Sequence, residues 1–376
     1  MPTDSGPSWE SAARGCGTGD IEAIVLVGGQ GTRLRPLTIA TPKPLLPTAG
    51  VPFLAHMLAR AAAAGITRVV LATAYRAELF AARFGDGSQF GLTLDFVQEQ
   101  VPLDTGGGIR NAAAMLRSGP DDPVVVLNGD VLSGHDLGAQ LELHCKQDAA
   151  ATLHLVEVLD PARFGCVPTD PGGRVTAFLE KTPRPLTNQV NAGCYVFRRR
   201  VIDEIPAGQR ISVERVTFPG LISSGQVLMG YLDNAYWLDV GTPAAFVRGS
   251  CDLVLGRLAS SALPGPCGEA LVLPGAVLEP GAQLTGGTVV GAGCHVGPDA
   301  HVDGSVLFDG VTIGARARIA GSVIGSAASV GEDTVLDGAV IGDGARIGAG
   351  NELRNGLRVW PGTDLGPTSI RFSADA

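Results

Sequence analysis

The sequence predicts an α/β domain built on a largely parallel sheet, followed by a parallel β-helix. Between residues 21 and about 245, strand-like apolar runs alternate with helix-like segments. This alternation is typical of βαβ units, whose crossover helices cover both faces of a parallel sheet. Beyond about residue 262, aliphatic side chains recur at steps of six residues with an occasional five. A period of this kind indicates the stacked coils of a β-helix.

The α/β part can be divided into its expected elements in chain order. We expect strands at 22–27, 68–73, 92–98 and 123–128, and helices at 51–64, 76–84 and 106–117. The segment 151–200, with strands at 151–158, 174–179 and 192–198, is expected to form an inserted platform that closes over a second substrate. A helix near 243–257 leads out of the domain. Active residues of such folds lie at the carboxyl ends of the strands, as do Gly28, Glu99 and Asp130.

The second part has one aliphatic position in each hexapeptide. A sandwich of alternating strands would instead show a period of two and turns about every 8–12 residues, which the segment lacks. The side chains expected to fill the interior are Leu273, Leu278, Leu284, Val290, Val296, Val302, Leu307, Ile313, Ile319, Ile324, Val330, Leu336, Ile341, Ile347, Leu353, Val359 and Leu365.

Composition limits the classes of partner. The length of 376 residues suggests two domains, and the net charge of −9 argues against nucleic acid and anionic membranes. The seven cysteines are odd in number and show no C-x-x-C, so reduced thiols are expected. No apolar run reaches membrane-span length, and residues 1–20 lack the apolar core of a signal peptide. We therefore expect a cytoplasmic protein with a flexible tail over 1–20.

A glycine-rich turn after the first strand indicates a phosphate site. Gly28, Gly29 and Gly31 allow positive φ and let backbone N–H groups face an anion, and a following helix would add its positive end. Arg33 supplies a planar, permanently charged fork for phosphate oxygens. An ordinary turn with a surface arginine is the alternative, but Lys43 between two prolines favours phosphate binding.

Two better-known glycine loops do not fit this turn. A P-loop requires G-x-x-x-x-G-K-[ST], and no Gly-Lys-Ser/Thr follows here. A dinucleotide site requires an acidic residue near the end of the second strand, whereas the strand 68–73 ends without a carboxylate. The turn therefore belongs to another class of nucleotide site.

The turn and its context resemble the sugar-1-phosphate nucleotidyltransferases, and within them the bacterial mannose-1-phosphate guanylyltransferases with a hexapeptide-repeat tail. G-G-x-G-T-R-L-x-P-L and P-K-P are followed by P-L-D-T-G-G-G, L-N-G-D, F-G, F-L-E-K, V-N-A-G-C-Y and Y-W-L-D-V-G-T-P in the family's order. The resemblance implies a Rossmann-like catalytic domain over 21–258. It also implies a left-handed β-helix over 262–376, with three hexapeptides per coil.

The resemblance assigns roles to individual residues. Arg33 would hold the β- and γ-phosphates, Lys43 would lie over the reacting phosphates, and Asp130 and Asp239 would bind Mg²⁺. Taken alone, Asp130 also fits a strand-end cap, and Glu180–Lys181 an exposed charge pair. The implied nucleotide-binding residues are Gly28, Gly29, Gly31, Thr32, Arg33, Glu99, Asp104, Thr105, Gly106 and Gly129, and those for the sugar phosphate are Gly165, Glu180, Lys181 and Asn191.

The implied reaction needs little covalent chemistry from the protein. A sugar 1-phosphate attacks the α-phosphorus of a nucleoside triphosphate, and pyrophosphate leaves. The attacking phosphate, with a second pKa near ~6, is already largely ionised at neutral pH. Catalysis therefore consists of positioning and charge neutralisation, without a general base.

Two residues bear on the choice of substrate. Glu99 offers only acceptors, which suit the adjacent N1–H and amino donors of guanine and favour GTP, although Gln98 and Gln100 flank it. Asp104 stands where relatives usually have the second residue of L-G-T-[AG]-G. Its carboxylate either redirects the ligand, as in an enzyme for a heptose, glucose or cyclitol phosphate, or points outward from a turn.

Two other functional classes remain open from the sequence. Hexapeptide β-helices include acyltransferases, but His295 and His301 are one hexapeptide apart and should lie on different faces. A regulatory subunit that senses nucleotide sugars without turnover would usually lack the phosphate-binding and metal-binding residues, which this sequence retains. We therefore interpret the tail as an assembly or regulatory module, typical of a homo-oligomer such as a dimer or tetramer.

Overall fold

The computed structural model describes residues 20–74, 76–179 and 184–371. These residues form two compact units, whose boundaries along the chain follow Gly29, His56 and Trp237. The first unit takes the described residues up to 29 and from 57 to 237, and the second takes 30–56 and the described residues from 238 onward. The segment Gln30–His56 thus belongs with the C-terminal part of the chain, although it lies early in the sequence. The domain limits at 258 and 262 stay predictions.

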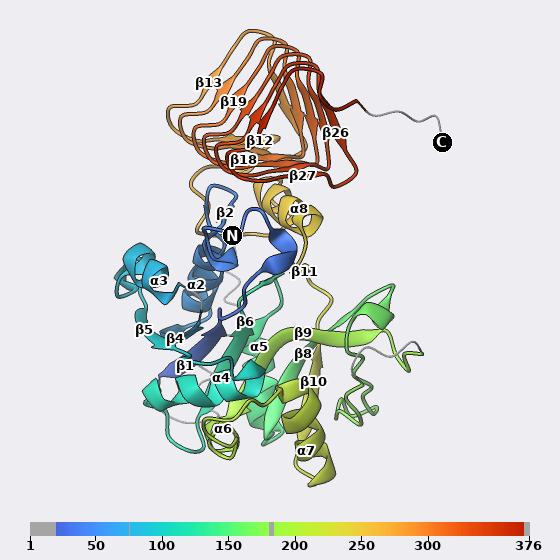
Figure 1. Cartoon of the computed structure of the whole chain (residues 1–376). Helices are drawn as coiled ribbons and strands as arrows, with labels where there is room; N and C mark the ends of the chain where they lie inside the picture. Colours follow the sequence, from blue (N-terminus) through green and yellow to red (C-terminus); the bar gives the residue numbers. More distant parts are fainter. Residues whose placement is uncertain (1–19, 75, 180–183, 372–376) are drawn as a thin grey trace, which may run out of the picture. The chain divides into compact units, whose positions relative to one another are not determined.

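The first unit contains a seven-stranded sheet (Figure 1). β9 runs antiparallel to β6 and β8, while the other neighbouring pairs are parallel, so the predicted mostly parallel sheet is confirmed. The strands, in sheet order, are β10 (Leu228–Leu232), β8 (Ala151–Glu157), β9 (Gln189–Arg198), β6 (Pro123–Asn128), β1 (Ile21–Leu26), β4 (Ile66–Thr73) and β5 (Thr93–Gln98).

Helices and short turns connect these strands. The α-helices are α2 (Phe53–Ala63), α3 (Ala77–Phe84), α4 (Asp104–Ala112), α5 (Leu137–Lys146), α6 (Arg199–Asp203) and α7 (Phe218–Ser223). The short elements are η3 (Ser88–Phe90), η4 (Ala113–Met115), η5 (Pro161–Arg163), the π-helical turn η6 (Val213–Thr217) and the strands β7 (Val131–Ser133) and β11 (Trp237–Asp239).

The core of this unit explains why these segments fold together. Apolar residues of the central strands and of α4 and α7 are fully buried. Phe197 of β9 stacks on Phe218 of α7, with ring centroids 5.8 Å apart, and Tyr195 meets Phe218 edge to face at 5.2 Å. Aromatic pairs of this kind add to the burial of apolar area.

The predicted strand at 174–179 is wrong. Its backbone N–H groups bond to two different segments, with Val175 to Leu228 of β10, and Thr176 and Leu179 to Pro168 and Cys166. Because the partners change along the segment, only isolated bridges form. The platform expected over 151–200 is not an insertion outside the sheet, because β8 and β9 belong to the main sheet.

The second unit consists of a hairpin, a helix and the β-helix. The hairpin joins β2 (Pro47–Thr48) to β3 (Val51–Pro52). The helix predicted near 243–257 is confirmed as α8 (Pro243–Val254), which ends earlier than predicted. In α8, Phe246 meets Phe308 of the β-helix edge to face at 6.2 Å. This contact joins α8 to the coils of the β-helix.

The β-helix has three parallel sheets, one on each side of the coil (Figure 1). The first comprises β12 (Ala270–Val272), β15 (Thr288–Val290), β18 (Val306–Leu307), β21 (Val323–Ile324), β24 (Val340–Ile341) and β27 (Arg358–Val359). The second comprises β13 (Val277–Leu278), β16 (His295–Val296), β19 (Thr312–Ile313), β22 (Ser329–Val330), β25 (Arg346–Ile347) and β28 (Asp364–Leu365). The third comprises β14 (Gln283–Thr285), β17 (His301–Asp303), β20 (Arg318–Ala320), β23 (Val335–Asp337) and β26 (Glu352–Arg354).

The spacing of paired residues agrees with three hexapeptides per coil. Leu271, Val289 and Val306 pair in succession and lie 18 and 17 residues apart. The stack has the architecture of the predicted left-handed β-helix. Aliphatic side chains from Val290 to Val359 fill the interior as expected. Leu278 is wrong as a core residue, since it is 42% exposed in the first coil, where stacking is one-sided.

Two further sequence expectations concern cysteines and membranes. Cys166, Cys194, Cys251, Cys267 and Cys294 are free thiols, as predicted. Cys145 is disulfide-bonded, so the expectation is wrong there. The wide spacing of cysteines along the chain does not reveal which of them meet in space. Across the described ranges, no helix is long and apolar enough to cross a membrane.

Candidate active site

Gly28, Glu99 and Gly129 lie just beyond the ends of parallel strands in the first unit. Leu26 is paired with Asn128, and the N–H of Gly129 donates to the Leu26 carbonyl at 2.9 Å. A Cβ at Gly129 would lie 2.4 Å from that oxygen, so the backbone approach requires glycine. Asp130 follows directly and is partly buried. The predicted placement of these residues at one edge of the sheet is confirmed.

The first two glycines of the turn have different surroundings. A Cβ at Gly28 would lie 3.3 Å from Cβ of Ala74, an approach that leaves little room for a side chain. At Gly29 nothing lies within 4 Å of a built Cβ. Packing therefore explains why residue 28 is glycine. It does not explain glycine at position 29, where the open space could instead admit a ligand.

In the second unit, Gly31 and Lys43 form a tightly packed turn. Gly31 has φ of 60°, and a Cβ there would lie 3.1 Å from both Lys43 Cβ and Thr38 Cγ2. The Thr38 hydroxyl donates to the Gly31 carbonyl at 2.8 Å. Lys43, in η2 (Lys43–Leu45), is only 8% exposed. A lysine buried this deeply needs hydrogen-bond acceptors or an opposite charge close to its ammonium group.

The helix expected after the glycine turn is not formed. The chain makes only η1 (Thr32–Leu34), a single 3₁₀ turn, and Arg35 ends it. A three-residue turn has no appreciable macrodipole. Any attraction of phosphate to this segment must therefore come from local N–H groups and side chains, and Thr32 and Arg33 are both exposed.

Arg33 lies against Gly241 in the same unit. A Cβ at Gly241 would be 2.6 Å from Nη2 of Arg33 and 3.0 Å from its Cζ. The missing side chain at position 241 thus makes room for the guanidinium. Asp239, at the end of β11, is two residues earlier and partly buried. The glycine of the motif W-L-D-V-G-T-P therefore provides the surface against which Arg33 packs. Sequence reasoning missed this contact.

Glu99 lies beside the glycines of α4. Its Oε2 accepts a hydrogen bond from the N–H of Leu103 at 3.1 Å, and Oε1 would lie 2.6 Å from a Cβ at Gly108. Burial raises the pKa of the Glu99 carboxyl above its ordinary value, and the nearby Asp104 carboxylate adds to this rise, while the Leu103 hydrogen bond opposes it.

The D-T-G-G-G segment is the first part of α4, not a loop. Gly106 and Gly107 both donate to the carbonyl of Ile211, at 2.7 and 3.1 Å. A Cβ at Gly107 would lie 2.3 Å from the carbonyl oxygen of Gln209. These glycines allow the helix to pack against residues 209–211. Gly106 was predicted to bind nucleotide, but packing alone already accounts for it.

The side chain of Thr105 is engaged within the protein. Its hydroxyl donates to Glu214 Oε2 at 2.8 Å and accepts from the N–H of Val213 at 3.0 Å. Asp104 has φ of 62°, is 37% exposed, accepts from Thr105 N–H at 2.8 Å and has Arg210 Nε 3.8 Å away. Positive φ explains why glycine suits position 104 and why aspartate is tolerated there.

Gly165 and Asn191 of the expected sugar site are adjacent. The N–H of Asn191 donates to the Gly165 carbonyl at 3.3 Å, and its side-chain amide donates to Tyr195 Oη at 2.8 Å. Glu180 and Lys181 lie outside the described residues. Sequence reasoning missed Tyr195 as the link between motifs, although it ends V-N-A-G-C-Y.

Tyr195 joins two of the motifs. Asn128 of L-N-G-D and Asn191 both hydrogen-bond to its hydroxyl. Burial raises the pKa of this hydroxyl well above its ordinary value, so Tyr195 stays neutral. The Asn128 Oδ1 atom is buried without a hydrogen-bond partner. A buried amide oxygen without a partner is uncommon in folded proteins.

A magnesium ion that is bound together with phosphate needs few ligands from the protein. Among the residues that the structure describes, no group of three or more His, Cys, Asp or Glu side chains is arranged to hold a metal. Mg²⁺ usually takes only one or two carboxylates and fills its remaining positions with water and phosphate oxygens. Asp130 and Asp239 supply hard oxygen donors of the required type.

Comparison with known proteins identifies the class. Residues 22–254 match the nucleotidyl transferase family, and residues 267–365 match the GMPPB C-terminal domain. The chain belongs to the nucleotidyl transferase family. It is therefore an enzyme of the nucleotidyltransferase class, as the sequence predicted.

Individual relatives are more specific. The chain is 55% identical to a mannose-1-phosphate guanylyltransferase of Mycobacterium tuberculosis, over 95% of this chain and 99% of the relative. It is 35% identical to the mannose-1-phosphate guanylyltransferase catalytic subunit beta of Drosophila melanogaster, over 68% and 70%. A crystal structure of HddC from Yersinia pseudotuberculosis complexed with GMP-PN is 27% identical, with a TM-score of 0.52 over 61% of this chain and 98% of that one.

Proposed function

We propose that this protein transfers GMP from GTP to mannose 1-phosphate, giving GDP-mannose and pyrophosphate. The observation that carries the proposal is the 55% identity, over nearly the full length of both chains, to a mannose-1-phosphate guanylyltransferase. Identity at this level extends through both the α/β part and the β-helix. The GMP-PN complex of the solved relative HddC supports a guanine nucleotide.

The phosphate groups are held by Arg33 and Lys43. The bare backbone of Gly241 leaves room for the Arg33 guanidinium, which offers paired N–H donors to the β- and γ-phosphates. Lys43 is fixed by the packing around Gly31, so its ammonium neutralises charge on the reacting phosphates. Gly28, Gly29 and Thr32 supply backbone N–H groups in this scheme.

Asp130 and Asp239 would hold Mg²⁺ together with phosphate oxygens. The ion, when bound, neutralises charge on the triphosphate and on the leaving pyrophosphate. The protein groups do not need to move a proton, since the attacking phosphate is already largely ionised at neutral pH. The residues therefore act by orienting the two substrates and by neutralising charge.

The base and the sugar occupy different parts of the strand ends. Glu99 accepts hydrogen bonds from guanine N1–H and from the amino group, and the close approach of Gly129 to Leu26 fixes the neighbouring strand end. Gly165 and Asn191 contact the hexose hydroxyls, and Glu180 and Lys181 complete the sugar-phosphate site. Thr105 and Gly106 act indirectly, by holding α4 in place.

We also propose a cytoplasmic homo-oligomer, a dimer or tetramer. The first coil of the β-helix supports association, because Val272, Val277 and Leu278 are exposed there. Light scattering on the full chain tests the assembly. A Leu278→Lys variant with the same mass as the parent would show that this coil is not the contact, and a monomeric parent would remove the proposal.

Pyrophosphate release tests the reaction directly. The full chain is incubated with Mg²⁺, GTP and a panel of sugar 1-phosphates, and ATP, UTP and dTTP replace GTP in parallel. Release with GTP and mannose 1-phosphate, at a kcat/KM at least tenfold above every other pair, is expected. Preference for another sugar would correct the substrate, and no release with any pair would refute the enzyme function.

A further inference from the structure

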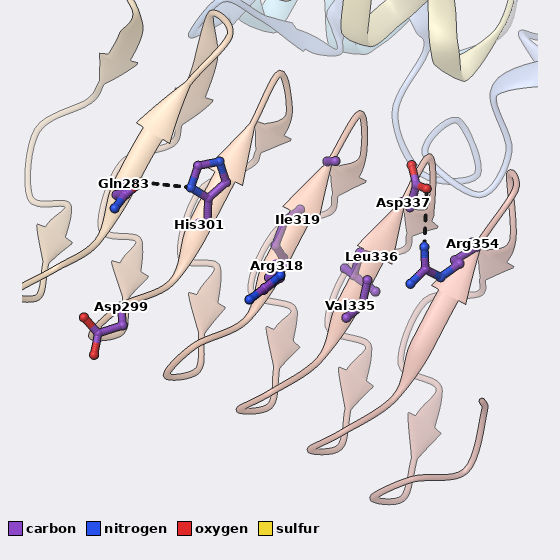
Figure 2. A pocket seen from close by; sticks show the side chains of 10 residues that line it. Gln283, Asp299, His301, Arg318, Ile319, Val335, Leu336, Asp337 and Arg354 are labelled. Atoms are coloured by element: carbon purple, nitrogen blue, oxygen red, sulfur yellow. Dashed lines mark hydrogen bonds and ion pairs between the residues drawn. The ribbon is translucent and has the colours of Figure 1, made fainter. Parts of the chain in front are cut away.

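A groove of about 570 Å³ lies on the outer face of the third sheet of the β-helix (Figure 2). All of its lining residues belong to the β-helix, so it is separate from the site described above. A volume of this order falls within the range of small-molecule sites, roughly 300–1,000 Å³. The nucleotidyl transfer chemistry assigns no role to it.

The register of the coils explains the hollow. His301, Arg318 and Val335 pair in succession, so their side chains stand side by side on the outer face about 4.8 Å apart. Ala320 lies on the same face, two residues after Arg318, and pairs with Asp337. Because the alanine side chain is small, it leaves a depression between the larger side chains on the same face. Ile319 faces the interior and is buried.

Arg318 differs from the other arginines of the β-helix. Arg316 pairs with Glu332 and Asp333, Arg346 with Asp364, Arg354 with Asp337 and Glu352, and Arg371 with Glu352. Arg358 donates to a backbone carbonyl at 2.7 Å. Within residues 262–371, Arg318 is the arginine for which the structure records no side-chain partner. Its guanidinium is exposed at the groove.

The neighbours of Arg318 restrict the ligand. His301 is held by a 3.1 Å hydrogen bond between Nδ1 and Gln283 Oε1, which Figure 2 shows beside Arg318. Asp299 and Asp337 also line the groove. Figure 2 shows Asp299 and Asp337 toward opposite ends of the groove, with Arg318 between them. One guanidinium in a groove that also carries two carboxylates suits a single phosphate group and disfavours a polyphosphate. The carboxylate and amide oxygens can accept hydrogen bonds from hydroxyl groups.

We propose that this groove binds a small polyol carrying one phosphate group. The phosphate binds Arg318 through paired N–H donors, and hydroxyl groups bind Asp337 and Gln283. The apolar surface of Val335 and Ala320 contacts the carbon skeleton. This ligand is distinct from the nucleotide and requires no chemistry at the groove.

Calorimetric titration of the full chain tests the proposal. Glucose 6-phosphate is the probe, since it has no phosphate at the anomeric carbon, and glucose and inorganic phosphate are the comparison ligands. Arg318→Gln removes the proposed phosphate contact. Arg316→Gln is the matched control, because Arg316 is two residues away, exposed and already paired with Glu332 and Asp333.

The expected result is binding to the parent and to Arg316→Gln with equal Kd, and at least tenfold weaker binding to Arg318→Gln. Glucose, which lacks the phosphate group, should bind to all three proteins as weakly as the probe binds to Arg318→Gln. Equal affinity of parent and Arg318→Gln, or no binding to the parent at about 10 mM, would overturn the site. Inorganic phosphate binding as tightly as the probe would overturn the polyol. The assay does not depend on turnover.

Discussion

Arg358 of the β-helix donates a 2.7 Å hydrogen bond from Nη1 to the carbonyl oxygen of Arg35. Arg35 directly follows η1, the turn that carries Arg33. β27, the last strand of the first β-helix sheet, thus fixes the backbone two residues beyond a proposed phosphate ligand. The bond is charge-assisted and links residues that are 323 positions apart.

Arg358→Ala should weaken nucleotide binding without unfolding the protein. Loss of one exposed hydrogen bond costs about 1 kcal/mol, so we expect KM for GTP to rise about fivefold. Steady-state kinetics measures the change. Arg346→Ala is the control, since Arg346 is exposed and pairs with Asp364 on the same β-helix. Equal KM values in the two variants would show that the Arg358 contact does not position the turn.

Gly241→Ala should reduce activity through Arg33. The added Cβ would be 2.6 Å from Arg33 Nη2, so the guanidinium must shift. We expect kcat/KM to fall at least tenfold, with a change in melting temperature under a few degrees. Gly268→Ala is the matched control, because nothing lies within 4 Å of its built Cβ. Full activity in Gly241→Ala would show that the packing of Arg33 against Gly241 has no role in catalysis.

Glu99→Gln should alter the choice of base. An amide both donates and accepts, whereas guanine presents two donors to a carboxylate. We expect use of GTP to fall at least tenfold relative to UTP and dTTP, measured by pyrophosphate release under competing nucleotides. The control Gln100→Ala changes an exposed neighbour. If the preference is unchanged, base recognition must be assigned to other residues.

Acid should destabilise the first unit through buried histidines. Burial lowers the pKa of His154 to about 4, with the Arg60 charge acting in the same direction. Its ring stacks on His135 at a centroid distance of 3.7 Å. Because the folded-state pKa lies below the unfolded value, the unfolded chain binds the proton first, and stability falls as the pH drops below 6.5.

The expected loss from His154 is about 2 kcal/mol between pH 6.5 and pH 5. Calorimetric melting across this range measures it. A His154→Gln variant removes the titrating ring and should show a shallower decline. A slope that is identical in the variant and the parent would assign the acid lability to other groups, such as His144, whose pKa burial also lowers to about 4.

Periodicity was sufficient to predict most of the fold. The spacing of Ile313, Ile319 and Ile324 places them inside the β-helix because each coil repeats the same three-sided path. The strand at 174–179 was mispredicted because its apolar residues meet different partners in turn. Local pattern reports which residues are buried, but not which backbone they face.

The sequence predicted which residues belong to the candidate site, but not the contacts that hold them in place. The strand ends of Gly129 and Glu99 follow from βαβ logic. The contact of Arg33 with Gly241 joins segments some two hundred residues apart, and no local pattern encodes it. Likewise the glycines of D-T-G-G-G are used for close packing of α4, which composition alone does not distinguish from phosphate binding.

The hairpin of β2 and β3 has a consequence for fragments of this chain. Ala49 N–H donates to Ser250 Oγ at 2.8 Å, and a Cβ at Gly50 would lie 3.0 Å from Pro264 and 3.1 Å from Leu273. Removing residues beyond α8 strips this hairpin of its apolar cover. A truncated catalytic fragment would then expose the hairpin surface that Pro264 and Leu273 cover in the intact chain. The coils are therefore part of what stabilises the hairpin, and a fragment without them should be less stable.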